Sequence, residues 1–190
     1  MPSLDSVLCR IVEKLEALDG QQPKVIKIDG CPGSGKSTLA TALGKAIDGQ
    51  VVKASDFIGT INGKPSPEER FKELYQWDEL EKKVLQPGKA GKHLQFTPRD
   101  SEGKNTEKIV QLCLPKKFIL LEGNFLGNPQ LNHLFDYSIY INADQDLRKR
   151  RLQDQGKGES PFYQDLIKLE QWYLENIKPE DNADFVYGSL

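Results

Sequence analysis

The residues best suited to chemistry form one short glycine-rich segment, Gly30-Cys-Pro-Gly-Ser-Gly-Lys-Ser37. It fits the pattern GxxxxGK[ST], in which glycines let the backbone wrap so that several N–H groups point at one phosphate. Lys36 could bridge the terminal phosphates of a nucleotide, and the Ser37 hydroxyl could bind Mg²⁺. We therefore expect ATP and Mg²⁺ as cofactors. The residues expected to bind them are Gly30, Cys31, Pro32, Gly33, Ser34, Gly35, Lys36, Ser37 and Thr38.

Two carboxylates could complete a phosphoryl-transfer site. This reaction needs a group that orients or deprotonates the acceptor. Asp56 follows a predicted strand at 50–54 and is the candidate base, because we expect that strand to run beside the strand before the glycine-rich loop. Glu122 ends a buried apolar run and could hold magnesium through water. The structural alternatives are a turn or N-cap role for Asp56 and a solvated strand end for Glu122.

A basic cluster at 148–151, Arg-Lys-Arg-Arg, could supply positive charge to the transferring group. Successive residues of a helix are about 100° apart, so only one or two of the four can reach a phosphate. The cluster comes shortly before Gly156-Lys-Gly158, which is typical of a lid that brings arginine to a transition state. Arg148 and Arg151 are the candidates, and a solvated charged face is the alternative.

The elements that position these residues alternate between strands and helices. Strands are predicted at 24–29, 50–54, 118–121, 137–141 and 184–187. Helices are predicted at 4–18, 36–48, 67–85, 146–155 and 161–177, the third of them stopped by Pro87-Gly88. This alternation indicates an α/β protein with the three-layer P-loop NTPase fold and a mainly parallel sheet of about five strands. Ligands of such sheets lie beyond the carboxyl ends of the strands.

The chain is predicted to form a single P-loop kinase domain, 1–190. Within it we expect an N-terminal amphipathic helix in 1–20, an acceptor-side segment at 57–107 and a short helical lid at 146–160. The stretch 88–107 is predicted to be irregular or to form a small hairpin over the site. The N-terminal helix is expected to dock on its own domain, with a dimerisation face as the alternative, so a homo-oligomer stays open.

Composition limits the partners. The 190 residues carry a net charge of −2, which offers no broad basic surface to nucleic acid. No apolar run approaches the roughly 18 residues that a membrane span needs, and the N-terminus lacks the pattern of a signal peptide, so we expect a cytoplasmic protein without membrane contacts. Cys9, Cys31 and Cys113 match neither a zinc site nor a disulfide framework, and we interpret them as reduced thiols.

From about residue 24 to the end, the sequence resembles the uridine kinase-like family of P-loop kinases, which is related to phosphoribulokinase and pantothenate kinase. The segments that carry the resemblance are 28–38, Ser55-Asp-Phe57, Trp77-Asp-Glu-Leu-Glu with Val84-Leu-Gln-Pro87, Leu121-Glu-Gly-Asn124, and Glu170-Gln-Trp-Tyr173 with Asn182-Ala-Asp-Phe-Val186. The resemblance implies that Asp56 is the general base, that Glu122 lies near the metal and the acceptor, and that the arginines of 148–151 belong to the lid. The sequence departs from the family pattern at 95–100 and in the lid, where Gln153 and Lys157 replace the more usual arginine.

The predicted function is an ATP-dependent phosphotransferase with an alcohol group as acceptor and with ATP and a small molecule as partners. The resemblance implies a nucleoside such as uridine or cytidine, and a pantothenate-, glycerate- or sugar-like alcohol is the alternative. A nucleotide-binding regulatory module is a rival from another class. Such switches usually carry an Asp-x-x-Gly strand end and a water-positioning glutamine, and neither is clearly placed in this sequence. A family member that retains only nucleotide binding is a third reading.

Overall fold

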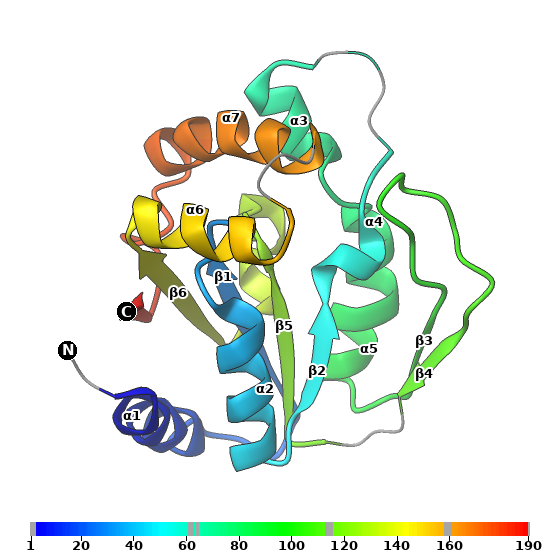
Figure 1. Cartoon of the computed structure of the whole chain (residues 1–190). Helices are drawn as coiled ribbons and strands as arrows, with labels where there is room; N and C mark the ends of the chain where they lie inside the picture. Colours follow the sequence, from blue (N-terminus) through cyan, green and yellow to red (C-terminus); the bar gives the residue numbers. More distant parts are fainter. Residues whose placement is uncertain (1–2, 61–62, 64, 113–115, 158–160, 190) are drawn as a thin grey trace.

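The fold is described from a computed structural model of the chain, covering residues 3–60, 63, 65–112, 116–157 and 161–189. Its centre is a five-stranded sheet in the order β2-β5-β1-β6-β7, and every pair of neighbours is parallel (Figure 1). The strands are β1 (Lys24–Gly30), β2 (Gln50–Lys53), β5 (Phe118–Asn124), β6 (Tyr137–Ala143) and β7 (Phe185–Ser189). The α/β fold class and the parallel five-stranded sheet predicted from the sequence are confirmed.

One expectation about strand order is wrong. The strand before Asp56 does not lie beside the strand that carries the glycine-rich loop, because β5 lies between them. Glu122 of β5 is the register partner of Lys53 in β2 and of Ile28 in β1. β5 has six buried residues and suits the interior of the sheet, whereas β2 is only four residues long and forms the edge. Glu122, rather than Asp56, therefore lies on the strand next to the phosphate loop.

Two helices, α1 (Leu4–Glu16) and α2 (Lys36–Ala46), cover one face of the sheet (Figure 1). The side chains of α1 that point to the sheet are at most 1% exposed and belong to the same apolar cluster as the β1 residues Ile26 and Ile28. They are Val7, Ile11 and Leu15. The apolar face of α1 is therefore buried within its own chain. No helix of the described residues is long and apolar enough to cross a membrane.

The opposite face carries a second apolar cluster, built from the acceptor-side segment and a C-terminal helix. The elements there are α3 (Pro67–Glu73), α4 (Trp77–Leu80), the π-helical turn η2 (Glu81–Leu85), α5 (Gln86–Lys89) and α7 (Pro161–Asn176). The prediction of one helix from 67 to 85 is wrong, because the chain leaves the helix around Tyr75, which forms a bridge with Ile58. Pro87 does not stop the helix either, because the chain stays helical from Trp77 to Lys89, with the π-helical turn η2 directly before Gln86 and Pro87.

A small antiparallel hairpin lies on the side of the molecule that carries α4 and α5 (Figure 1), and its residues line one cavity together with residues of the edge strand β2. It consists of β3 (Leu94–Phe96) and β4 (Val110–Leu112). The stretch 88–107, predicted to be irregular or to form a small hairpin, therefore contains the first strand of a hairpin, and the second strand follows that stretch. The remaining elements are the 3₁₀ turns η1 (Ala54–Phe57) and η3 (Pro129–Leu134) and the basic helix α6 (Gln145–Asp154).

One buried carboxylate, Asp29, joins three of these segments where β1 ends. It accepts hydrogen bonds from the N–H of Gly30 at 2.7 Å, from the N–H of Leu126 at 3.0 Å, and from the hydroxyl of Tyr173 on α7. That hydroxyl also accepts the N–H of Gly127 at 2.8 Å. The polar groups are thus satisfied in a site where Asp29 is only 2% exposed, and the start of the phosphate loop is fixed to α7 and to the segment after β5.

Tyr173→Phe removes one donor from the buried Asp29 carboxylate. We expect the free energy of unfolding to fall by about 1–3 kcal/mol, the usual cost of an unsatisfied buried polar group. Urea denaturation measures this change. The matched control is Tyr137→Phe, because the half-buried Tyr137 hydroxyl has no hydrogen bond to the described residues, and its effect should stay below about 0.5 kcal/mol. Equal losses for the two variants would contradict the role given to Tyr173.

Candidate active site

The loop between β1 and α2 forms one wall of a cavity of about 750 Å³. Gly33 and Gly35 adopt φ angles of +77° and +98°, a region that favours glycine. At Gly33 a Cβ atom would lie 2.7 Å from the carbonyl oxygen of Arg148, so no other residue fits without a shift. Gly35 is also the N-cap of α2, which places the positive end of that helix at the cavity. The geometry fits a bound phosphate group.

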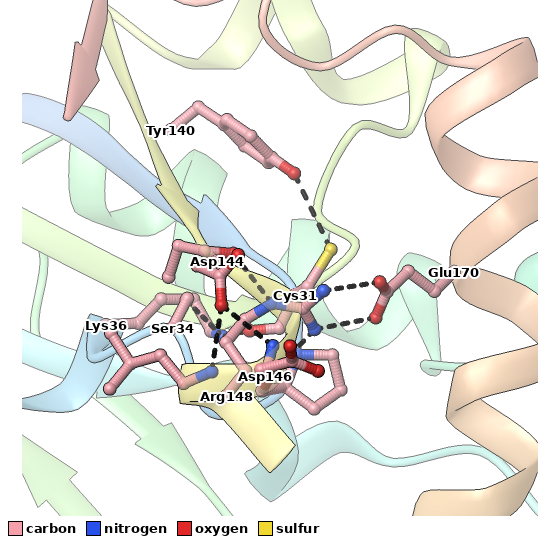
Figure 2. Close-up of polar contacts among 11 residues, drawn as sticks. Cys31, Ser34, Lys36, Tyr140, Asp144, Asp146, Arg148 and Glu170 are labelled. Atoms are coloured by element: carbon pink, nitrogen blue, oxygen red, sulfur yellow. Dashed lines mark hydrogen bonds and ion pairs between the residues drawn. The ribbon is translucent and has the colours of Figure 1, made fainter. Parts of the chain in front are cut away.

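Lys36 lies buried beneath this loop. Its ammonium group donates to the carbonyl oxygen of Cys31 at 2.8 Å and to the Ser34 hydroxyl at 3.3 Å (Figure 2). Burial lowers the pKa of Lys36 to about 8, against the opposing effect of nearby negative charges, of which Asp29 is the largest. A phosphate in the cavity would provide the counter-charge that this ammonium group lacks.

Ser37 and Glu122 meet at the same cavity. The Ser37 hydroxyl donates to Oε1 of Glu122 at 2.9 Å, and Glu122 is 7% exposed. Among the described residues no three or more His, Cys, Asp or Glu side chains gather as a metal site. The chain would therefore give Mg²⁺ one or two oxygen ligands and leave the others to phosphate and water, which is how this ion is usually held. The two predicted metal residues fit such an ion.

Arg148 does not face the cavity, contrary to the prediction of a transferring-phosphate contact. Its Nη1 and Nη2 donate to the two carboxylate oxygens of Glu170 on α7, at 2.8 and 2.6 Å (Figure 2). Its Nε donates to the carbonyl of Ala143 at 3.0 Å, and Nη1 also reaches the carbonyl of Pro32 at 3.3 Å. With 8% exposure and these partners, Arg148 holds the phosphate loop against α6 and α7.

Arg151 is the residue of the basic cluster that lines the cavity, and it also contacts the phosphate loop. Its Nη1 donates to the carbonyls of Gly33 and Ser34 at 3.3 and 3.4 Å, and the side chain lines the cavity. Lys149 and Arg150 are exposed, as the helical spacing requires. The end of the predicted lid, 158–160, lies outside the described residues.

Asp56 lies in η1 and lines a second cavity of about 360 Å³, beside the first. Partial burial raises the pKa of Asp56, the charges of Lys53 and Lys108 oppose this, and Glu122 adds to it. Lys53 lines both cavities, so the two adjoin at that side chain. Sequence reasoning did not select Lys53, although its place at the end of β2, three residues before Asp56, was a usable signal.

Other residues around the sites were also not predicted. Leu4 of α1 and Tyr187 of β7 line the large cavity, and they come from opposite ends of the chain.

The thiol of Cys31 lies 3.6 Å from the Tyr140 hydroxyl, and burial raises its pKa to about 12, so it stays protonated near neutral pH. Cys9 is free and exposed, and Cys113 lies outside the described residues.

Comparison with known proteins places this site in a class. No protein-family model matches the chain. A uridine kinase of Staphylococcus epidermidis is 29% identical over 167 residues, which cover 83% of this chain and 79% of the relative. A uridine kinase of Ligilactobacillus salivarius is 26% identical over 190 residues, with coverage of 87% and 89%.

Solved structures share the fold. A protein of Bacillus stearothermophilus described as a possible uridine kinase superposes with a TM-score of 0.74 at 23% identity, covering 97% of this chain and 98% of its own. The D-glycerate 3-kinase of Cryptococcus neoformans gives a TM-score of 0.61 at 12% identity, with coverage of 92% and 88%.

The fold, the phosphate loop and the relatives define a P-loop kinase, a phosphotransferase that acts on an alcohol group. Within that class the chain is similar to the uridine kinases over most of its length.

Arg148→Met would leave the buried Glu170 carboxylate without its partner. We expect the free energy of unfolding, measured in urea, to fall by about 3–5 kcal/mol. Replacing both residues, as Arg148→Met with Glu170→Leu, should recover most of that loss because no buried charge remains. Lys149→Met, on the exposed side of the same helix, should change stability by less than about 0.5 kcal/mol. A loss below about 1 kcal/mol for the single variant would show that the pair does not hold the loop.

Proposed function

We propose that this chain transfers the γ-phosphate of ATP to a hydroxyl of a small acceptor, a nucleoside such as uridine or cytidine. The observation that carries the proposal is the junction of two cavities, one with a phosphate loop and one with a carboxylate, at Lys53. The nucleoside acceptor is supported by relatives named uridine kinase that align with more than four-fifths of the chain. We also propose a cytoplasmic location, because ATP and nucleosides are both available there.

The nucleotide side uses the phosphate loop and the start of α2. The loop N–H groups and Lys36 would hold the terminal phosphates, and the loop carbonyls hold Arg151 at the rim of the cavity. Mg²⁺, when bound by Ser37 and near Glu122, would offset charge on the phosphates. Arg148 would act as a positioning residue, because it connects the loop carbonyl of Pro32 to Glu170.

The acceptor side uses Asp56. In the proposed step the acceptor oxygen bonds to the γ-phosphorus, the bond from that phosphorus to ADP breaks, and the acceptor proton passes to the Asp56 carboxylate. Partial burial of Asp56 raises its pKa, which makes it a stronger base than a solvated carboxylate. Phe96 and Val110 give the cavity an apolar wall that suits the body of a small organic acceptor.

The substitution Asp56→Asn separates a kinase from a nucleotide-binding regulatory module. We expect phosphoryl transfer to uridine or cytidine to fall by at least about 100-fold, because the amide cannot take the proton. The affinity for a non-hydrolysable ATP analogue, measured by calorimetry, should stay within about 3-fold, since Asp56 lies outside the cavity with the phosphate loop. In the wild-type chain, transfer should decline as the pH falls through the raised pKa of Asp56, because the protonated carboxyl cannot act as the base.

The control is Asp78→Asn, a carboxylate that is 87% exposed on α4 and lines neither cavity, and it should transfer phosphate at the wild-type rate. Unchanged transfer in Asp56→Asn would refute its role as the base. If no acceptor changes the rate of ATP hydrolysis, in either the wild type or the variant, the result would favour the regulatory module.

A further inference from the structure

The arrangement of Arg148 leaves an unfilled role at the site. The transferring phosphoryl group carries negative charge on its oxygens, which cations must offset. Arg148 is bound to Glu170 and lies outside both cavities. Lys36 and Arg151 are held at the phosphate loop, on the nucleotide side. Neither Lys36 nor Arg151 lines the cavity of Asp56, so a further cation where the two cavities meet would act on the acceptor side of the transferring group.

Lys53 occupies that place. It is the last residue of β2, and its register partner in β5 is Glu122, which lies at the predicted metal site. Its side chain lines the cavity of the phosphate loop together with Ser37, and it lines the second cavity together with Asp56. It is exposed, and no hydrogen bond or ion pair joins it to another described residue. Its ammonium group is therefore available to a ligand in either cavity.

We propose that Lys53 is a further catalytic residue, whose ammonium group contacts the phosphoryl group as this group passes from ATP to the acceptor. This inference rests on the proposed function. The acceptor proton still goes to Asp56, and Lys53 takes no part in the proton transfer. The ammonium group offsets the charge that the transferring oxygens carry between the two cavities.

The same position gives Lys53 an effect on the base. The charged groups that act on Asp56 are Lys53, Lys108 and Glu122. Partial burial raises the pKa of Asp56, and the two lysines oppose that rise. Loss of either lysine should therefore move the acidic limb of the pH–rate profile to higher pH. Only Lys53 also reaches the nucleotide cavity, so only its loss should slow the reaction at pH values where Asp56 is fully ionised.

The test compares pH–rate profiles of phosphoryl transfer for the full-length chain and its variants. Lys53→Met should lower kcat on the upper pH plateau by about 100-fold, the usual effect of losing one preplaced group that stabilises transition-state charge. KM for ATP should change much less than kcat. Lys53→Arg, which keeps the charge, should recover at least about a tenth of the wild-type kcat.

Two further variants separate the effects. Lys108→Met should shift the acidic limb in the same direction as Lys53→Met but lose much less of the plateau kcat. Lys92→Met, an exposed lysine outside both cavities, should leave the profile unchanged. Thermal unfolding midpoints equal to the wild type would confirm that the variants are folded.

The results distinguish this inference from the proposed function. A wild-type chain that transfers phosphate, with a Lys53→Met plateau kcat within about 3-fold of it, overturns the role of Lys53 alone. If Lys53→Met and Lys108→Met lower the plateau kcat equally, that also overturns the role of Lys53. The loss would then come from removing any positive charge near Asp56. A wild-type chain that transfers phosphate to no acceptor overturns the proposed function and the inference with it.

Discussion

The site depends on the way in which one face of α7 holds the start of the phosphate loop. Tyr173 donates to the buried carboxylate of Asp29, and Glu170, three residues earlier on α7, binds both terminal nitrogens of Arg148. Residues three apart on a helix lie on the same side, so α7 contacts both groups with one surface. Asp29 immediately precedes the loop, and Arg148 reaches the loop carbonyl of Pro32. The loop is therefore held on both sides before any nucleotide arrives, which is the preorganisation that phosphate binding needs.

Strand order then decides where the reacting groups lie. Because β5 separates β1 from β2, the phosphate loop and Asp56 stand two strands apart, with Glu122 between them. The hairpin of β3 and β4 lines the cavity of Asp56 together with residues of β2. The cavity of the phosphate loop and the cavity of Asp56, the proposed donor and acceptor sites, thus adjoin across the end of one edge strand. This separation would give room for the two substrates of the proposed reaction, and Lys53 lies at the boundary between the two cavities.

Features encoded in a few neighbouring residues were predictable from the sequence. The loop from Gly30 to Ser37 and the five strands depend on local spacing, and the structure contains them. The order of β2, β5 and β1 depends on long-range pairing, which strand-like runs alone do not specify. The helix around Tyr75 was predicted as continuous because its apolar spacing is helical on both sides of the break, and the bridge to Ile58 that interrupts it is a tertiary contact.

The arginines show the same limit for the site. In the sequence Arg148 and Arg151 are equivalent members of one basic cluster. Glu170, which lies 22 residues after Arg148 on another helix, takes one of them away from the cavity. Lys53 was overlooked for the opposite reason, because a single lysine at a strand end is common and only the position of two cavities distinguishes it. The sequence thus shows which residues are charged, whereas the tertiary fold decides which group each of them contacts.

The most direct test of the central claim follows the γ-phosphate of ATP by ³¹P NMR, with the wild-type chain, Mg²⁺ and uridine or cytidine in one sample. The account predicts that the γ-phosphate signal disappears while a phosphomonoester signal and the signals of ADP grow in equal amounts, with no inorganic phosphate. Formation of inorganic phosphate alone, or no loss of ATP with these nucleosides or with pantothenate, glycerate and sugars, would contradict it.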